Sequence, residues 1–397
     1  MSPTPRPDPA APANAVLLGH GDFGAKSGGV RARMADRVAA DVAAALDAAG
    51  IDADVEQPWS RIVLRTDRPE AAARTAATVP GVGFARPAVA TDPRLPSLTG
   101  AARRLAATAS HRRDETYAVD SDRIGPADAH GFSNDEVKRE VGRVVGEVTG
   151  AGVDLDDPDR TYRIEAREAA AFVSVDRIDG PGGLPVGSQG RVVALVSGGI
   201  DSPVAAWRLL RRGFAVVPVY VDLGEYGGAD HRARAIDAVG TLAARAPRAD
   251  LRPRVVDGGP LVERVVAATH DTRMLSLRRV MLSAADGVAD RAAAHGLATG
   301  EAAGQKSSQT GANLAVTDAA ASRPVHRPLL SADKADIVAE ARALGTYDGS
   351  TVPVGCERIA PPHPETAATR SAVADAEPDD LLDAAREAGR DAEIVPL

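Results

Sequence analysis

The chain has 397 residues, a net charge of −8 and a hydrophobic content of 44%, which is enough for two or three domains with buried cores. Its single cysteine excludes an intramolecular disulfide and any cysteine-rich metal site made by this chain alone. No apolar run reaches the length of a membrane span, and the proline-rich residues 1–12 lack the hydrophobic core of a signal peptide. We therefore expect a disordered tail over residues 1–12 and a cytoplasmic protein without a membrane partner.

Residues 13–71 predict a small α+β domain of the ferredoxin-like kind. A helix that begins near Val30 carries an apolar residue at every fourth position up to Leu46. Lys26 lies in the glycine-rich loop before this helix, where an RNA contact and an ordinary solvated residue fit the pattern equally well. A strand, a helix, two strands and a helix are expected in that order, at residues 15–18, 30–49, 51–55, 62–64 and 71–78.

Residues 72–178 predict a second α/β unit that is rich in arginine. Ser133 is the expected N-cap of its second helix, and Asp122 with Arg123 is expected to form a basic loop after its first strand. Helices are expected at 98–109 and 134–149, and strands at 116–119, 162–166 and 172–175. Guanidinium groups bind phosphate in a bidentate manner, which favours a face that contacts phosphate. A solvated face is the alternative. The arginines concerned are Arg103, Arg104, Arg112, Arg113 and Arg123.

Residues 179–190 are rich in glycine and proline and are predicted to be a linker to a third unit, residues 191–397. In this unit apolar strands alternate with amphipathic helices, which is typical of a parallel, doubly wound sheet. Ligands bind such sheets at the carboxyl ends of the strands. Strands are expected at 192–196, 215–221, 251–256 and 297–299, and helices after residue 202 and at 231–244, 261–270, 275–295 and 333–344.

The first strand of the third unit runs into a turn that is suited to phosphate. Ser197-Gly198-Gly199 has two residues without a Cβ atom, so backbone N–H groups can close on an anion. Ser202 is the expected N-cap of the following helix, whose dipole would point at the bound charge. The stretch has no GxxxxGK[ST] pattern and is therefore not a Walker loop. A strand, a glycine turn and a helix N-terminus together predict a phosphate site.

The pattern Ser-Gly-Gly-x-Asp-Ser resembles the PP-loop of enzymes that split ATP to AMP and pyrophosphate. Three further stretches follow it, and the four in this order resemble the tRNA uracil 4-sulfurtransferases, the ThiI-type 4-thiouridine synthetases. The resemblance covers nearly the whole chain. The further stretches are Thr299 to Thr310, Arg327-Pro328-Leu329-Leu330 with Asp333-Lys334, and Gly355-Cys356 with His363-Pro364-Glu365-Thr366.

This resemblance implies an α/β protein with a ferredoxin-like domain, a THUMP domain that binds tRNA over residues 72–178, and a PP-loop ATP pyrophosphatase domain over 191–397. It implies that ATP, with Mg²⁺, adenylates O4 of uridine 8 in tRNA, and that sulfur then replaces the activated oxygen. The implied partners are tRNA and a cysteine desulfurase or another persulfide or sulfide donor, whereas the oligomeric state, including a homodimer, stays open. Sulfur supply for the thiamine thiazole stays an open additional role.

The resemblance also assigns residues by position. Asp201 and Lys334 match polar residues that the family needs for adenylation, and Cys356 matches its cysteine near the carboxyl end. A helix cap for Asp201, a surface residue for Lys334 and a small buried hydrophobe for Cys356 are the alternatives. No residue is assigned as a metal ligand. The expected nucleotide contacts are Leu195, Val196, Ser197, Gly198, Gly199, Asp201, Ser202, Tyr220, Val221, Arg278, Gly300 and Gln309.

The sequence departs from the family pattern in three respects. After the second strand of the third unit, Tyr220-Val221-Asp222 stands where the family usually has an aromatic-His-Ser-Pro-Pro segment. The cysteine pair of iron–sulfur-carrying relatives is missing, and no rhodanese segment follows, so we expect a short form. Two rival functions stay open: a PP-loop enzyme that adds ammonia, which a required Cys356 would argue against, and a tRNA-binding module without catalysis.

Overall fold

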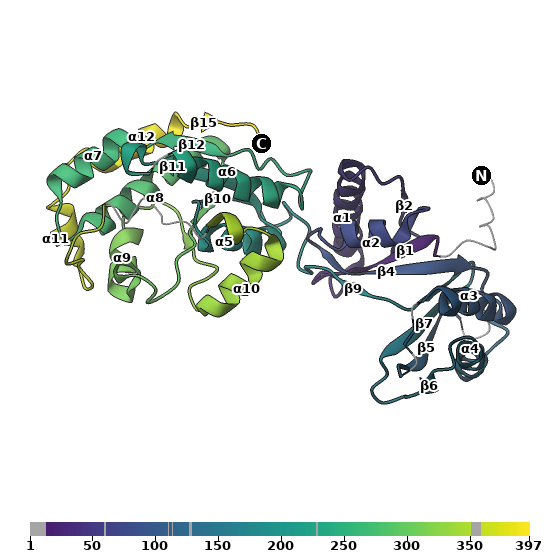
Figure 1. Cartoon of the computed structure of the whole chain (residues 1–397). Helices are drawn as coiled ribbons and strands as arrows, with labels where there is room; N and C mark the ends of the chain where they lie inside the picture. Colours follow the sequence, from purple (N-terminus) through teal and green to yellow (C-terminus); the bar gives the residue numbers. More distant parts are fainter. Residues whose placement is uncertain are drawn as a thin grey trace. The chain divides into compact units, whose positions relative to one another are not determined.

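The structure is a computed structural model, and it describes residues 13–58, 61–109, 111–112, 114–126, 129–227, 229–350 and 359–397. Contacts within the chain divide it into two compact units (Figure 1). The amino-terminal unit extends to Gly183, and the carboxy-terminal unit begins at Leu184. Among the described residues, no helix has both the length and the apolar character that crossing a membrane requires.

The amino-terminal unit is built on one mixed sheet with the strand order β2-β3-β1-β4-β8-β7-β5-β6, and β9 pairs with β4. Its first six elements run β1, α1, β2, β3, α2, β4, and the strand order β2-β3-β1-β4 is that of a ferredoxin-like domain. The strands are β1 (Ala15–His20), β2 (Asp54–Glu56), β3 (Ile62–Arg65), β4 (Val82–Thr91), β5 (Thr116–Ile124), β6 (Gly152–Val153), β7 (Arg160–Arg167), β8 (Ala171–Ser174) and β9 (Ile178–Asp179). The helices are α1 (Gly28–Ala48), α2 (Pro69–Ala76), α3 (Leu95–Thr108) and α4 (Asn134–Thr149).

The strand β4 was not predicted, although it lies in the middle of this sheet and pairs with both β1 and β8. Its sequence contains Gly83 and Pro87, which are unfavourable in a central strand. Pro87 is accommodated because β4 pairs with β9 at residues 84–85 and with β8 at residues 88–91, which leaves residue 87 in the gap. The predicted domain boundary at residue 71 falls inside α2.

Two local predictions in this unit have opposite outcomes. The helix start at Ser133 is confirmed, because its hydroxyl accepts a hydrogen bond from the backbone N–H of Glu136 at 3.1 Å, and Gly150 ends α4 in the left-handed conformation. The basic loop at Asp122 and Arg123 is wrong. Both residues belong to β5, which pairs in parallel with β7 as far as Ile124.

The carboxy-terminal unit contains a second sheet with the order β14-β13-β10-β11-β12-β15. All neighbouring pairs are parallel except β12 with β15. The strands are β10 (Arg191–Leu195), β11 (Ala215–Asp222), β12 (Arg254–Asp257), β13 (Gly296–Ala298), β14 (Val325–His326) and β15 (Glu393–Ile394). The helices are α5 (Asp201–Arg211), α6 (Ala229–Ala243), α7 (Gly259–Ala268), α8 (Arg273–Ala292), α9 (Gly311–Asp318), α10 (Lys334–Leu344), α11 (Arg370–Ala374) and α12 (Leu381–Arg390), with short 3₁₀ turns η1 (Gly224–Tyr226), η2 (Ser307–Gln309) and η3 (Asp348–Ser350).

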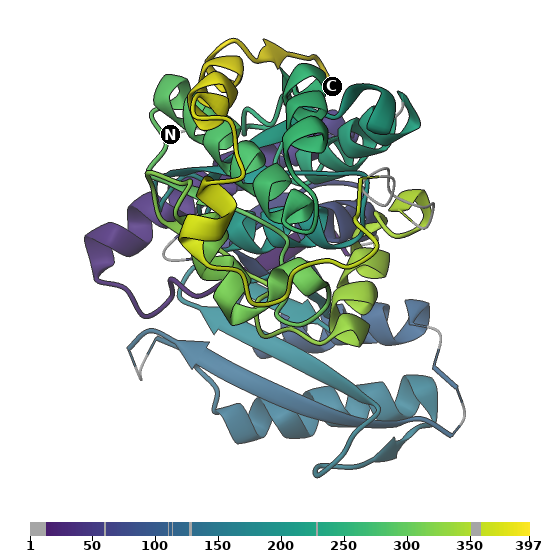
Figure 2. The same ribbon diagram turned by 90° about the vertical axis from the view of Figure 1, so that its left-hand side faces the viewer.

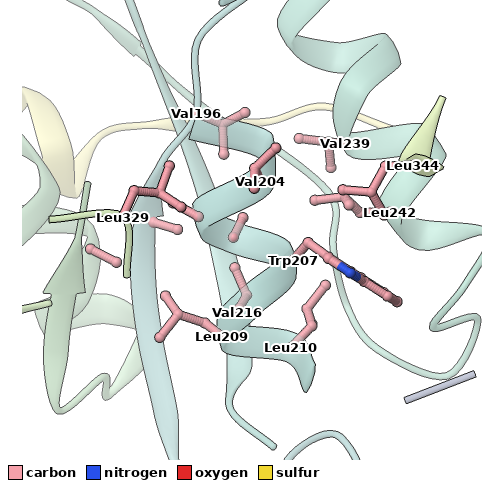
Figure 3. Close-up of a cluster of buried hydrophobic side chains, with 14 of the residues drawn as sticks. Val196, Val204, Trp207, Leu209, Leu210, Val216, Val239, Leu242, Leu329 and Leu344 are labelled. Atoms are coloured by element: carbon pink, nitrogen blue, oxygen red, sulfur yellow. The ribbon is translucent and has the colours of Figure 1, made fainter. Parts of the chain in front are cut away.

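Alternate residues of β10 enter two different hydrophobic cores, so helices cover both faces of this sheet. Val192 and Ala194 pack with Trp207 of α5 in one core, which Figure 3 shows together with residues of α6 and α10. Val193 packs with Leu277 and other residues of α8 in the other core. The predicted doubly wound parallel sheet is therefore confirmed, and the antiparallel edge strand β15 is an addition to it.

Helix α12 packs closely along α8, and the contact depends on two glycines. A Cβ atom on Gly287 of α8 would collide with the backbone oxygen of Arg386, and one on Gly389 of α12 would collide with the backbone oxygen of Ala284. The yellow helix α12 and strand β15 lie together at one edge of the unit in both views (Figures 1 and 2). Neither α12 nor β15 was predicted.

The segment that was predicted as a linker is held by hydrogen bonds in both units. In the amino-terminal unit, Gly180 and Gly182 donate from their backbone N–H groups to the oxygens of Gly83 and Val82, at 3.0 and 2.8 Å. In the carboxy-terminal unit, the N–H of Leu184 donates to the oxygen of Arg211 at 2.8 Å. A Cβ atom on Gly180 would lie 2.3 Å from the backbone oxygen of Val82, so this glycine allows close backbone packing within the amino-terminal unit.

Candidate functional site

The turn between β10 and α5 is shaped by two serines. The Ser202 hydroxyl accepts a hydrogen bond from the backbone N–H of Ser197 at 2.8 Å, and the two hydroxyl oxygens are 3.1 Å apart. Ser202 is the second residue of α5, so its predicted role as the N-cap is wrong. No described side chain caps the start of α5. Its first N–H groups therefore have no side-chain partner and can receive an anion.

The loop after β13 lies directly against this turn. A Cβ atom on Gly300 would come within 2.7 Å of both the backbone N and the Cα of Ser202, so only glycine allows this approach. On another side, a Cβ on Gly198 would lie 3.2 Å from the backbone oxygen of His231 in α6. The structure thus brings together three predicted nucleotide contacts, Gly198, Gly300 and Ser202. They lie where the chain order reverses between β10 and β13, which is where open α/β sheets bind ligands.

The two polar residues predicted for adenylation form an ion pair. The Lys334 Nζ atom lies 2.5 Å from the Asp201 Oδ1 atom. Asp201 is the first residue of α5, and Lys334 is the first residue of α10. The lysine side chain stays 49% exposed and that of the aspartate 26% exposed, so both can reach a molecule in solution.

A buried network of charged residues supports the same strand ends. The carboxylate of Glu301, only 7% exposed, binds Arg278 of α8, the Thr299 hydroxyl at 2.9 Å and the Arg327 Nε atom at 2.8 Å. Arg327 also contacts the carboxylate of Asp318 in α9 with two nitrogens. Sequence reasoning did not assign Glu301 or Arg327 to the site, although both lie in stretches that carry the family resemblance.

Other predicted nucleotide contacts lie at the ends of adjacent strands. Tyr220 and Val221 are buried in β11, and the backbone N–H of Val196 donates to the oxygen of Val219 at 2.8 Å. Leu195 is the last residue of β10. Gln309 is 6% exposed, and its side-chain oxygen has no hydrogen-bond partner among the described residues. A buried acceptor of this kind can be satisfied by a bound ligand.

Next to the glycine turn, His231 is an uncharged residue. Burial, followed by the positive charge of Arg234, lowers the pKa of His231 below its ordinary value. At neutral pH the ring is therefore neutral. Positive charge near the turn comes from Lys334 and from Arg234, which lies beside Gly198. No described group of three histidine, aspartate or glutamate side chains could hold a metal ion by itself.

Cys356 lies outside the described residues, in the segment 351–358. The chain before it ends in η3 at Ser350, and the chain after it resumes at Ile359, which is fully buried in the core beside α8. Arg273 of α8 donates to the backbone oxygen of Ile359 at 3.5 Å.

The arginines predicted to contact RNA occupy different environments in the amino-terminal unit. Arg103 and Arg104 lie in α3, and Arg103 forms an ion pair with Glu147 of α4 at 3.2 Å. Arg112 is 72% exposed and lies 3.4 Å from a carboxylate oxygen of Glu115. Arg123 donates to the backbone oxygen of Phe132 at 2.7 Å. Arg113 lies outside the described residues, and Lys26 is exposed in the loop before α1.

Two family models match the chain. The model described as "Thiamine biosynthesis protein (ThiI)" matches residues 187–381, and the THUMP domain model matches residues 94–176. With the fold and the glycine turn, these matches define a protein of the class that joins a THUMP domain to a PP-loop nucleotide fold.

A "Probable tRNA sulfurtransferase" of Halobacterium salinarum is 48% identical over 96% of this chain and 96% of its own length. One of Methanosarcina acetivorans is 36% identical over 89% of this chain and 87% of its own length. The chain belongs to the tRNA sulfurtransferase (ThiI) family.

A solved structure shares this fold over nearly the whole chain. It is the crystal structure of a 4-thiouridine synthetase–RNA complex with bound ATP, with a TM-score of 0.84, 24% identity and coverage of 97% of this chain and 100% of that one. A protein from Pyrococcus horikoshii has a TM-score of 0.66 and 20% identity, over 84% of this chain and 99% of its own.

Proposed function

We propose that this protein makes 4-thiouridine at position 8 of tRNA, by adenylating O4 of the uracil and replacing it with sulfur. The observation that carries the proposal is the Asp201–Lys334 ion pair at the glycine turn, against which Gly300 closes. The relatives named tRNA sulfurtransferase, and a structural neighbour that is a 4-thiouridine synthetase with bound RNA and ATP, support the same reaction. Because the ThiI model is described by thiamine biosynthesis, sulfur supply for the thiamine thiazole is a second proposed role.

The adenylation step follows from the residues at the turn. The first N–H groups of α5 and the Lys334 ammonium would offset the negative charge that develops as pyrophosphate leaves the α-phosphate. Mg²⁺ commonly binds through one or two carboxylates and substrate phosphates, and the partly exposed Asp201 carboxylate at the turn fits this role. When bound, Mg²⁺ would supply further charge neutralisation to the leaving pyrophosphate.

Gln309, Arg278 and the ends of β10 and β11 would hold the nucleotide. Arg278 is oriented by the Glu301 carboxylate, and the unsatisfied oxygen of Gln309 is available to a ligand donor. Attack by uracil O4 on the α-phosphorus then forms the adenylated base and releases pyrophosphate. The uracil carbonyl oxygen is a poor leaving group, and adenylation converts it to AMP, which leaves readily.

Sulfur transfer is proposed to use Cys356, the single cysteine of the chain. A cysteine desulfurase or another donor would load it as a persulfide, whose terminal sulfur attacks C4 and expels AMP. An external thiol would then attack the Cys356 sulfur, which releases the thiolated base and forms a disulfide that a reductant reopens. A partner thiol or a reductant is required because the chain holds no second cysteine.

The tRNA is proposed to contact the amino-terminal unit through Lys26, the arginines of α3 and the following loop, and Arg123 of β5. A chain of net charge −8 needs such a local basic surface to bind a polyanion. The proposed contacts are Lys26, Arg103, Arg104, Arg112, Arg113 and Arg123.

The test combines two products of one reaction. The protein is incubated with unmodified tRNA, ATP labelled at the α-phosphate, Mg²⁺, cysteine, a cysteine desulfurase and a reductant. We expect labelled AMP in the nucleotide fraction, unlabelled pyrophosphate as the second product, and 4-thiouridine in the nucleosides of the digested tRNA. Formation of ADP and phosphate, or tRNA without 4-thiouridine, contradicts the proposal.

A second experiment separates the two steps. Replacement of the only thiol in Cys356→Ser should stop 4-thiouridine formation while pyrophosphate is still released, because adenylation does not need the thiol and the AMP stays on the base until sulfur or water displaces it. Cys356→Ala is the control for any effect of the serine hydroxyl, because alanine has no polar side-chain group. Full activity of either variant with added sulfide would show that sulfide attacks the adenylated base directly.

A further inference from the structure

The carboxylate of Glu301 joins the loop after β13 to two arginines that are distant in the sequence. One carboxylate oxygen binds Arg278 of α8, and the other accepts from the Thr299 hydroxyl at 2.9 Å and from the Arg327 Nε atom at 2.8 Å. The side chains of Glu301 and Arg327 are both buried. A buried carboxylate is costly unless it is paired, so these contacts fix the position of Glu301 and of its neighbour Gly300.

Arg327 is held on its other side by a second carboxylate. Its two terminal nitrogens contact the carboxylate oxygens of Asp318, the last residue of α9, at 3.1 and 2.5 Å. A guanidinium group presents its N–H donors in a fixed plane, which lets Arg327 bind both carboxylates at once. Arg327 therefore ties the buried carboxylate of Glu301 to the end of α9.

The backbone segment that carries Arg327 is itself fastened to the sheet and to α5. The backbone N–H of Thr299 donates to the oxygen of His326 at 3.1 Å. Arg208 of α5 donates to the backbone oxygen of Pro328 at 3.0 Å. The segment therefore has a fixed position beside α5, and the side chain of Arg327 transmits this position to the buried carboxylate.

The charges of this network leave Arg278 attractive to an anionic ligand. With Arg278 as the single arginine partner of Glu301, the two side chains would form a neutral pair that attracts a phosphate only weakly. Arg327 shares the buried carboxylate, and the balancing charge of Asp318 lies at the solvent side, where its side chain is 42% exposed. The Nε atom of Arg278 is buried and has no hydrogen-bond partner among the described residues, so a ligand acceptor can satisfy it.

We propose that Arg327 is a positioning residue for ATP, because through Glu301 it holds Arg278 and Gly300 where the nucleotide contacts them. This inference rests on the proposed function, which makes Arg278 a nucleotide contact. Arg327 acts through Glu301 and not on the nucleotide itself, since its side chain is buried between two carboxylates. The role concerns binding of ATP, because the ion pair proposed for adenylation lies outside this network.

The test compares the KM for ATP with kcat in the full-length Arg327→Lys protein. Lysine keeps the positive charge, but its ammonium group cannot span both carboxylates as the guanidinium does. We expect the KM for ATP to rise on the order of tenfold and kcat to fall by less than about threefold, because an interaction made equally in the ground and transition states is weakened. Initial rates of pyrophosphate release at saturating tRNA, with the ATP concentration varied, measure both quantities.

A double-mutant cycle shows whether Arg327 acts through Arg278. Arg278→Lys should raise the KM for ATP by itself. In that background, Arg327→Lys should raise the KM by less than about twofold further, because the contact that Arg327 supports is already weakened. Independent effects would multiply instead, and the full rise in the Arg278→Lys background would overturn the positioning role.

A matched control lies at the next residue of α8. Arg279 is also buried, and its Nε atom pairs with the carboxylate of Glu377 at 2.9 Å. Arg279→Lys should lower the midpoint of thermal unfolding but change the KM for ATP by less than about twofold, because this buried pair does not include Glu301.

A milder variant covers the case in which Arg327→Lys does not fold. Asp318→Asn removes a charge at the exposed end of the network and should raise the KM for ATP about threefold, since Arg327 loses one of its two charged partners. Asp318→Glu keeps a carboxylate and should raise the KM less. Equal KM values for the unmodified protein and Asp318→Asn would contradict the positioning role.

The outcomes separate this inference from the function on which it rests. If the unmodified protein releases no pyrophosphate from ATP in the presence of tRNA, the proposed function is wrong. If it releases pyrophosphate and Arg327→Lys keeps the KM for ATP of the unmodified protein, the positioning role is wrong. The role is also wrong if only kcat falls, in parallel with the folded fraction, because Arg327 would then only stabilise the fold.

Discussion

The two units both contain many arginines, but they place them in different surroundings. In the amino-terminal unit, Arg103 of α3 is paired with Glu147 of α4 at the surface, where the two side chains are 53% and 48% exposed. In the carboxy-terminal unit, Arg278 and Arg327 share the buried carboxylate of Glu301 at the strand ends. The carboxyl ends of parallel strands lie at one edge of a sheet, so polar residues from distant parts of the sequence meet there.

The surroundings of an arginine decide whether it can bind a phosphate or instead holds other residues in place. An exposed ion pair contributes about 0–1 kcal/mol and is screened by salt, so a paired surface arginine offers an incoming phosphate less than its formal charge suggests. A buried network fixes the geometry of its members, because breaking it leaves an uncompensated charge. The arginine count therefore overstates the basic surface of the amino-terminal unit.

The largest effect is expected at the strand ends of the carboxy-terminal unit. Asp201→Asn removes the carboxylate that pairs with Lys334 and should lower the rate of AMP formation at least about 100-fold, as loss of a group that stabilises developing charge does. Affinity for tRNA should stay within about twofold. Release of labelled AMP measures the rate, and filter binding measures the affinity for tRNA. Asp237→Asn, at an exposed position of α6, is the matched control, and an Asp201→Asn enzyme with normal AMP formation would contradict the assignment.

A smaller effect is expected in the amino-terminal unit and compares two adjacent arginines. No described carboxylate pairs with Arg104, whereas Arg103 pairs with Glu147. Arg104→Ala should reduce the slope of log affinity for tRNA against log salt by about one, the value of one phosphate contact. Arg103→Ala should reduce it by less than half as much. Equal reductions would show that the pairing with Glu147 does not limit phosphate binding.

The smallest effect concerns stability against acid. His111 is 5% exposed in its side chain, and its Nε2 atom lies 2.7 Å from the Tyr162 hydroxyl. Burial, followed by the charge of Arg160, lowers the pKa of His111, and burial raises the pKa of Tyr162 to about 12. The hydroxyl therefore stays protonated, and it shares a hydrogen bond with the Nε2 atom of the neutral ring.

In the unfolded chain His111 takes up a proton near its ordinary pKa of about 6.5, while the folded protein does so at lower pH. Unfolding then binds a proton, so the free energy of unfolding falls as pH decreases below about 6.5. His111→Gln should reduce the loss of thermal midpoint between pH 7.5 and pH 5.5. His270→Gln, at an exposed position, is the control. The same loss in His111→Gln as in the unmodified protein would exclude this origin.

The sequence predicted the carboxy-terminal unit well because the patterns that indicate its strands, turns and helices each lie within a short stretch of sequence. A β-branched strand, two glycines and a helix occur within Arg191 to Gly213, and the strands that surround them alternate with helices. The strand β4 was missed because Gly83 and Pro87 are tolerated only through pairing partners that lie far along the chain. The start of α5 was misplaced because Ser202 bonds back to Ser197, and a cap pattern does not distinguish this arrangement.

Side chains whose roles depend on tertiary contacts could not be assigned from the sequence. Glu301 and Arg327 lie inside the recognised stretches, but their partners are contributed by other elements. The ion pair of Asp201 with Lys334 was not foreseen as a contact, although both residues were selected. Residue identity indicated the chemistry, and only the fold shows which residues support one another.

The contact between α8 and α12 limits how this chain can change over generations. Gly287 and Gly389 each make room for a backbone oxygen of the facing helix, not for a side chain. A mutation that adds a Cβ at one position cannot be compensated by a smaller residue at the other, since neither glycine can be made smaller. We expect the two glycines to be inherited as a fixed pair while the exposed residues of α12 vary freely.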